Sequence, residues 1–325
     1  MKLIDKIKIQ ISTLKEFPKR VFLNGFANGC KLFFLNSMLI WIDDDFRRKS
    51  LYYKKHHTDK LFVQQLANNI IVDRKQPVET QDYFVWILWW QSEEAMPPII
   101  HATINSIRAA TNKKVVLITL KNIKDYIEVP DFIWGKYIRK QMGPAHFSDY
   151  VRVALLEKYG GLWIDSTVLC TNMIPDWIYN EQFFTIRAID KVTDELDEKY
   201  VAKGRWNTQV LGTNMKDTSF FKIVRILLEQ YWSRYNYMID YLMFDDVILY
   251  AYENYPDIKK SIDAVPISNL KMHSLLPIIN SEYNQNLWIG LTKNTILFKL
   301  TYKGNFKENV NGKETFYGYI LRKWK

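Results

Sequence analysis

The strongest constraint on the fold lies in residues 83–169, where apolar runs of strand length alternate with stretches of helical periodicity. Residues 84–90 are continuously apolar, as expected of a strand that is buried on both faces. Two prolines then start a helical pattern over residues 97–110, and residues 115–120 form a second apolar run. Strand, helix and strand in this order predict an α/β fold with a mostly parallel central sheet.

A further helix and strand follow these two strands. Ser148 is a favourable N-cap, so the sequence predicts a helix that begins there and places Asp149 in its first turn. Gly160 and Gly161 end this helix, the first with a left-handed backbone, and residues 162–169 are predicted to continue as one strand. Farther along the chain, helical patterns cover residues 220–232 and 235–254, and a strand pattern covers residues 296–302.

The first 78 residues have a different character, with apolar positions at mixed helical spacings. Pro77 marks a break, so we predict a helical N-terminal extension of residues 1–78 and a catalytic domain of residues 79–325. The most apolar early stretch, residues 21–42, is interrupted by polar residues. Its apolar runs are shorter than the roughly 18 to 20 residues that a membrane-spanning helix needs. We therefore expect this stretch to lie on a surface or to pack in a core.

Charge and composition narrow the class of partner. The net charge is +10, and residues 1–80 hold fifteen basic against eight acidic residues. A basic N-terminal region can contact the phosphates of anionic lipids or nucleic acid, although a solvated basic face is an equally good reading. Aromatic residues make up 15% of the chain, which suits the stacking of rings on sugars or bases as well as an aromatic core. The chain lacks an RNP-like motif, a zinc pattern and a glycine-rich phosphate loop, which argues against nucleic-acid binding.

The N-terminal sequence and the cysteines bear on the compartment. The first twenty residues mix charge into every turn and do not resemble a secretory signal. Two cysteines, without metal-ligand spacing or the density of a disulfide scaffold, fit a reducing compartment. We expect a cytoplasmic protein that contacts the inner face of the membrane peripherally through residues 1–78.

The residues with the clearest chemical potential are Asp149, Arg152 and Asp165. Asp149 and Arg152 are three residues apart and so share one face of the predicted helix near its start, where backbone dipoles favour anions. Asp165 follows the next strand, and ligands of open α/β sheets bind at the carboxyl ends of strands. From spacing alone, a solvated ion pair and a turn or helix-cap residue are the commoner explanations of these positions.

The segment SDYVRVALLEKYGGLWIDST resembles the SD-x-x-R, YGG and D-x-D signature of glycosyltransferase family 32. More narrowly, VWILWWQSEE at residues 85–94 and GGLWIDST resemble the capsular polysaccharide synthesis proteins. The resemblance covers residues from about Tyr83 to Lys303 and leaves the first eighty residues outside it. It implies a GT-A type nucleotide-diphospho-sugar transferase fold and a sugar-nucleotide-dependent glycosyltransferase.

The resemblance also implies roles for single residues. Asp149 and Arg152 would hold hydroxyls of the donor sugar, and Asp165 would contact the donor ribose and a metal ion. Thr167 stands where the family motif has its second Asp. The expected ligands of a Mn²⁺ or Mg²⁺ ion are therefore Asp165 and Thr167. Because the hydroxyl of Thr167 is a weaker and neutral ligand, the motif is compatible with a metal-dependent and with a metal-independent enzyme. The base would lie at the end of the first strand, near Trp86, Trp89, Trp90 and Gln91.

The C-terminal half contributes further candidates. The first candidates are Asp240, Asp245 and Asp246. They are expected either to lie opposite the donor, as acceptor contacts or with Asp245 as a catalytic carboxylate near the anomeric carbon, or to form a helix cap with exposed charges. Asn207, next to Trp206, resembles the segment that lines the sugar pocket in such enzymes. Lys299 matches a late H-K-L-T motif and would reach the diphosphate, but Phe298 replaces the histidine of that motif. In the N-terminal half, His146 lies two residues before Ser148 and is expected either to approach the diphosphate or to be an ordinary loop histidine.

The predicted function is transfer of a hexose from a UDP-sugar to a glycan acceptor, either free or lipid-linked, in the synthesis of capsular or other cell-surface polysaccharide. The resemblance to family 32 implies retention at the anomeric carbon. The alternative is a catalytically inactive scaffold of a polysaccharide assembly complex, suggested by Thr167 and by the basic N-terminus.

Overall fold

The computed structural model describes residues 3–43, 45–67, 82–189, 200–214, 217–236 and 240–325. Its main sheet has the strand order β2-β1-β3-β6-β5. Strand β1 is parallel to both β2 and β3, and β6 is antiparallel to β3 and β5. Four of the five strands in this sheet therefore run in one direction, which confirms the predicted mostly parallel α/β sheet. The bounds are β1 Phe84–Leu88, β2 Lys114–Ile118, β3 Gly161–Ile164, β5 Phe184–Thr185 and β6 Val210–Thr213.

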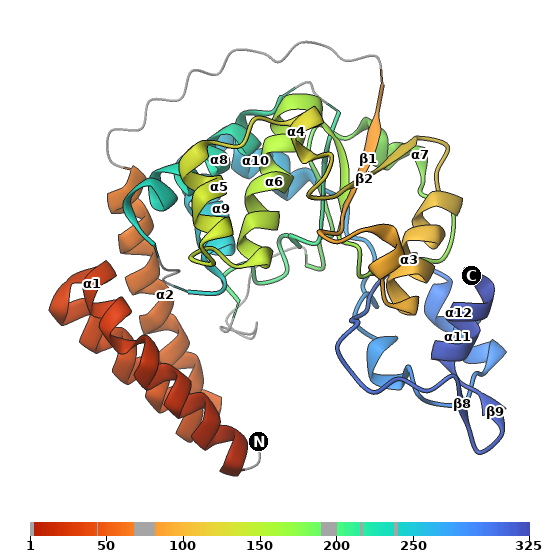
Figure 1. Ribbon diagram of the computed structural model, residues 1–325, viewed down its shortest axis with the longest axis horizontal. Helices are drawn as coiled ribbons and strands as arrows, with labels where there is room; N and C mark the ends of the chain where they lie inside the picture. The colour runs from red at the N-terminus through yellow and green to blue at the C-terminus, as the bar shows by residue number, and fades with distance from the viewer. Residues whose placement is uncertain (1–2, 44, 68–81, 190–199, 215–216, 237–239) are drawn as a thin grey trace.

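Helices cover both sides of this sheet (Figure 1). On one side, α6 (Pro144–Tyr159) packs on α8 (Ser219–Arg234), and α8 packs on α9 (Met243–Asn254). On the other side, α3 (Pro98–Ala109) packs against α12 (Phe316–Lys323). The remaining elements are η1 Glu93–Ala95, α4 Ile123–Tyr126, α5 Asp131–Ile138, β4 Val168–Cys170, α7 Asp176–Asn180, α10 Pro256–Ala264, η2 Leu276–Ile278, α11 Gln285–Thr292, β7 Leu297–Lys299, β8 Asn309–Val310 and β9 Lys313–Glu314.

Helix α6 begins earlier than the sequence pattern indicates. Its N-cap is Gly143, and Pro144 occupies the first helical position, where its missing N–H costs nothing. Ser148 is therefore an interior residue and the predicted cap there is wrong, so Asp149 lies in the second turn. His146 also belongs to this helix and not to a loop. The pair Asp149 and Arg152 still shares one helix face, because the spacing of three residues is unchanged.

The two glycines after α6 adopt backbone conformations that other residues avoid. Gly160 has φ 61° and ψ −148°, and Gly161 has φ 93°. Both are positive, as the sequence predicts for the first of them, and they turn the chain directly from α6 into β3.

The predicted single strand over residues 162–169 is two strands in different sheets. The N–H of Val168 donates to the carbonyl of Asp165 at 2.9 Å, which closes a turn after β3. Residues 168–170 then form β4, which pairs with β7 in a separate two-stranded sheet. Of the predicted helix over residues 235–254, the part from Met243 to Asn254 forms α9, and residues 237–239 lie outside the described residues.

The N-terminal residues form two helices, α1 (Leu3–Trp41) and α2 (Asp45–Ala67), which pack on each other as a helical hairpin. Figure 1 shows it in red and orange, extending away from the α/β body. Helix α2 packs on α8 and α9, and its Phe62 and Leu66 belong to the main hydrophobic core. Across the described residues, every helix is too short or too polar to cross a bilayer. Pro77 and the predicted boundary at residue 78 lie outside the described residues.

Candidate active site

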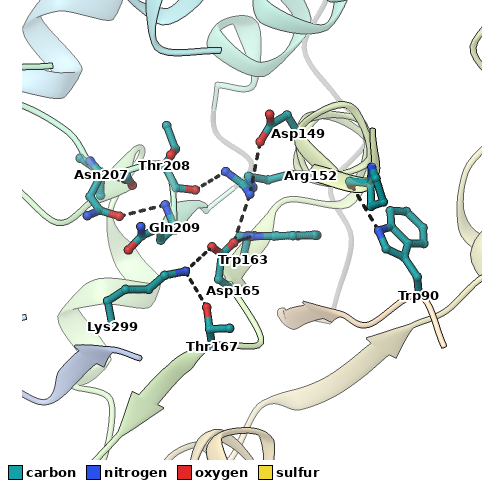
Figure 2. Close-up of polar contacts among 12 residues, drawn as sticks. Trp90, Asp149, Arg152, Trp163, Asp165, Thr167, Asn207, Thr208, Gln209 and Lys299 are labelled. Atoms are coloured by element: carbon teal, nitrogen blue, oxygen red, sulfur yellow. Dashed lines mark hydrogen bonds and ion pairs between the residues drawn. The ribbon is translucent and has the colours of Figure 1, made fainter. Parts of the chain in front are cut away.

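Arg152 lies at the centre of a polar cluster at the carboxyl end of β3 (Figure 2). Its side chain is 5% exposed and lies 3.1 Å from Asp165 Oδ1 and 3.5 Å from Asp149 Oδ1. Its guanidinium also donates to the carbonyl of Thr208. The indole of Trp163 packs on it with 5.0 Å between Cζ and the ring centroid. The helix face of α6 and the end of β3 therefore meet at one cation, as predicted from their spacing.

Asp165 binds two cations through its two carboxylate oxygens. Oδ1 accepts from Arg152 and, at 2.9 Å, from Trp163 Nε1, whereas Oδ2 accepts from Lys299 Nζ at 3.0 Å. Its backbone N–H donates to the carbonyl of Gln209 at 2.9 Å, which fixes the position of the residue. Burial would raise the pKa of Asp165, but the charges of Lys299 and Arg152 hold that pKa below its usual value. Asp165 is therefore ionised at neutral pH.

Lys299 reaches Asp165 because of the pairing between β4 and β7. The register places Val168 opposite Lys299, and the N–H of Leu300 donates to the carbonyl of Thr167 at 2.8 Å. Phe298, the neighbour of Lys299, is fully buried. Successive strand residues point to opposite faces, so Lys299 projects toward the site, where its Nζ also donates to Thr167 Oγ1 at 2.5 Å. Sequence reasoning named Lys299 and Thr167 separately and did not pair them.

Two further carboxyl groups face this cluster. The pKa of Asp149 is raised to about 7, mainly by burial and also by the charges of Asp165 and Asp245, against the opposing effect of Arg152. The pKa of Asp245 is raised to about 6 by burial, against the opposing effects of the hydrogen bond from Trp206 Nε1 at 2.9 Å and of the charge of Arg152. Asp149 thus titrates near neutral pH, where a carboxyl group can exchange protons with a substrate hydroxyl.

Asn207 has a structural role beside the site. Its Oδ1 accepts from the N–H of Gln209 at 2.9 Å, and its own N–H donates to Thr185 Oγ1 at 2.8 Å. These bonds shape the turn that presents the carbonyl of Thr208 to Arg152 (Figure 2). Sequence reasoning missed Trp163, Thr208 and Gln209. Trp163 could have been found, because it lies on β3 two residues before Asp165, which directly follows that strand, so the two side chains share one side of the sheet.

The three tryptophans in and just after β1 differ in burial. Trp86 is fully buried and donates from Nε1 to the carbonyl of Gly160 at 2.8 Å, so its predicted role at a nucleotide base is wrong. Trp90 is partly exposed, stacks on Phe147 at 4.8 Å and donates to the carbonyl of Pro144 at 3.2 Å. Trp89 and the exposed Gln91 adjoin it just beyond the end of β1. Because Trp86 pairs with Trp163, these residues lie just past the level of Asp165.

Asp240 and Asp246 belong to another cluster. Lys55 of α2 lies 2.9 Å from Asp240 and 3.1 Å from Asp59. Burial raises the pKa of Asp246 well above its usual value, with Asp59 raising it and Lys55 lowering it. This cluster joins the hairpin to α9 and leaves Asp245, one residue earlier, on the site.

At the predicted metal position, an ammonium group already occupies the protein oxygens. At phosphate-binding sites, Mg²⁺ and Mn²⁺ are held by one or two protein carboxylates together with waters and phosphate oxygens. Here one carboxylate and one hydroxyl are available, and each already accepts from the ammonium of Lys299. In the described part of the chain, His, Cys, Asp and Glu side chains form no group of three that could hold a metal ion. The residues present therefore fit an ammonium better than a metal ion.

A comparison with protein families now places the chain. The family of capsular polysaccharide synthesis proteins matches residues 40–320. The chain belongs to this family. The match begins within α1 and includes all of α2, so the family extends farther toward the N-terminus than the motif resemblance, which begins at Tyr83.

Comparisons with individual proteins add less. No curated protein sequence matches the chain. Among solved structures, it is similar to the apo structure of the bifunctional glycosyltransferase WbbM, with 14% identity and a TM-score of 0.41. That alignment covers 77% of this chain and 51% of WbbM, so the chain spans about half the length of that protein.

Proposed function

We propose that this member of the capsular polysaccharide synthesis family is a GT-A type glycosyltransferase. It moves a hexose from a nucleotide-diphosphate sugar, a UDP-sugar in our proposal, to a glycan acceptor. The observation that carries the proposal is an ionised Asp165 at the carboxyl end of β3 that holds Arg152 and Lys299 on its two oxygens. Parallel α/β sheets bind ligands at this edge, and paired fixed cations suit a departing diphosphate.

The surrounding residues support this chemistry. As the bond from the anomeric carbon to the diphosphate breaks, negative charge grows on the leaving oxygen, and Arg152 and Lys299 would stabilise it. Asp149, with its pKa of about 7, would accept a hydrogen bond from a sugar hydroxyl. In the described residues the buried Oε1 of Gln209 has no hydrogen-bond partner, which favours a ligand donor beside it.

The remaining parts of the site fit the two substrates. Trp89, Trp90 and Gln91 lie at the end of β1, where we place the base. Asp245 lies on the side of α9, where we place the acceptor hydroxyl. The resemblance to family 32 favours retention of configuration, with the acceptor held on the face that the diphosphate leaves.

We expect purified protein to bind and slowly hydrolyse one member of a panel of UDP- and GDP-sugars. Asp165→Ala should lower turnover about 100- to 1,000-fold, because it removes the group that positions both cations. Glu93→Ala, which breaks an exposed ion pair with Arg108, serves as the matched control and should retain full turnover. Liquid chromatography of the released UDP or GDP measures both rates.

The alternative, a non-catalytic scaffold, gives a different result in the same preparation. A ligand that binds the folded state raises its melting temperature. If neither UDP nor any sugar nucleotide shifts the melting temperature, and Asp165→Ala behaves like the unchanged protein, the transferase assignment is wrong and the scaffold is favoured.

We further propose that α1 docks the enzyme on an anionic membrane, which brings the site to a lipid-linked acceptor. Apolar side chains recur on one face of α1 at helical spacings and are exposed to solvent, including Phe22 at 69% and Phe26 at 76%. Lys8 and Lys15 are exposed and follow Ile4 and Ile11 by one turn, so they lie on the same face. An apolar face flanked by lysines suits the interface of an anionic bilayer. The apolar residues are Leu3, Ile4, Ile7, Ile11, Leu14, Phe22 and Phe26.

Replacing Phe22 and Phe26 together by Ser should weaken vesicle binding at least about tenfold, because two large apolar side chains no longer enter the interface. Phe34→Ser is the matched control, since Phe34 is 62% exposed on another side of the same helix. Co-sedimentation with phosphatidylcholine vesicles, with and without phosphatidylglycerol, measures binding. Equal binding by the double variant, or binding that ignores phosphatidylglycerol, would disprove the docking proposal.

A further inference from the structure

We infer that Lys299 supplies the positive charge that a metal ion provides in D-x-D glycosyltransferases, and that this enzyme binds its donor diphosphate without a divalent cation. The inference rests on the proposed function and names the cofactor requirement of that same site. It starts from the position of one ammonium group, which lies where a metal ligated by Asp165 and Thr167 would have to bind.

The ammonium group of Lys299 already lies between Asp165 and Thr167. Its Nζ lies 3.0 Å from Asp165 Oδ2 and 2.5 Å from Thr167 Oγ1 (Figure 2). An ammonium has three N–H donors, so two are used here and one remains for an oxygen of the diphosphate. The side chain is 22% exposed, which leaves the group accessible to a ligand.

Residue 167 is a threonine where the family motif has an aspartate. A hydroxyl accepts a hydrogen bond from an ammonium without adding negative charge. Two cations, Arg152 and Lys299, against the single carboxylate of Asp165 leave a net charge of +1 toward the diphosphate, and a second Asp at position 167 would cancel it unless a divalent ion were bound. Thr167 and Lys299 thus act as a matched pair.

The positive charge at the site comes from two side chains. Arg152 lies on Oδ1 of Asp165 and Lys299 on Oδ2, so two fixed cations flank the carboxylate. Together they carry the charge of one divalent ion. The backbone also holds Lys299 in place, because β7 is paired with β4 from Val168 to Cys170. Charges that are fixed before the ligand arrives need no rearrangement when the diphosphate leaves.

The test is the affinity for UDP, measured by calorimetry in EDTA and in Mn²⁺. The unchanged enzyme should give the same affinity in both buffers. Lys299→Met should bind UDP at least about tenfold more weakly in both, because a charge-assisted contact to phosphate is lost. Lys299→Arg should recover part of the affinity, and Lys293→Met, at an exposed lysine after α11, should bind like the unchanged enzyme.

A second variant converts the site. In the double variant Thr167→Asp, Lys299→Ala, the missing carboxylate is restored and the ammonium is removed. Its UDP affinity should become dependent on Mn²⁺, with at least about a tenfold gain over EDTA. The melting temperature of each variant shows that it is folded.

The outcomes separate the inference from the proposed function. Equal UDP affinity in EDTA and Mn²⁺, with a loss in Lys299→Met, supports the inference. A gain of tenfold or more with Mn²⁺ in the unchanged enzyme, or full affinity in a folded Lys299→Met, overturns it and leaves the transferase proposal in place. Absence of UDP binding in every buffer overturns both.

Discussion

Arg152→Met is expected to reduce donor turnover at least about 1,000-fold and to lower the free energy of unfolding by about 3 kcal/mol. The guanidinium is buried and holds Asp149, Asp165 and the carbonyl of Thr208 together. Its loss leaves the carboxyl groups of α6 and β3 without their shared cation. Urea denaturation measures the stability, and UDP release from the donor measures turnover.

Two further variants identify the cause of the Arg152 effect. Arg152→Lys keeps the charge but cannot reach three acceptors with a planar fork, so it should recover stability more than turnover. Arg139→Met, at an exposed arginine, should change neither quantity by more than about 0.5 kcal/mol or twofold. If Arg152→Met retains turnover while folded, the site does not perform the proposed reaction.

Gly161→Ala is expected to lower the free energy of unfolding by about 3 kcal/mol or more. A Cβ on Gly161 would lie 2.3 Å from the carbonyl oxygen of Phe84 and 3.0 Å from Nε1 of Trp86. The backbone φ of 93° is also unfavourable for alanine. Strand β3 lies between β1 and β6, so a shift here moves Asp165 as well.

Gly290→Ala is the matched control for Gly161→Ala. Gly290 lies within α11, and a Cβ there would have no neighbouring atom within 4 Å. Alanine should therefore be neutral or stabilise by up to about 1 kcal/mol. Thermal and urea unfolding of both variants make the comparison. A Gly161→Ala protein as stable as the unchanged one would contradict the close packing of β1 against β3.

The sequence predicts the sheet, the two glycines and the meeting of Asp149, Arg152 and Asp165, because these depend on local periodicity and on the rule that strand ends share an edge. It misplaces the start of α6. Ser148 has a side chain that favours an N-cap, but the helix begins earlier, with Gly143 as the N-cap and Pro144 at the first helical position. It predicts one strand through residue 169 because no Gly or Pro marks the turn at Asp165.

The contacts of Lys299 depend on pairing between distant parts of the chain. Lys299 is 132 residues from Thr167, and their contact follows from the register of β4 and β7. No local pattern encodes that register. The same holds for Thr208, whose backbone carbonyl, and not its side chain, binds Arg152. The sequence places Trp86 at the nucleotide base because the strand pattern does not show which of the tryptophans the neighbouring helices cover.

The cluster of Lys55, Asp59, Asp240 and Asp246 has a consequence for how the protein can be divided. Asp245 faces the site and Asp246 faces the hairpin from the same turn of α9. The active site and the attachment of the hairpin therefore depend on the same turn of one helix. A protein shortened to begin after α2 would keep Asp240 but lose the lysine that binds it. Exchange of hairpins between relatives should therefore succeed when residues 55, 59, 240 and 246 are exchanged as one set.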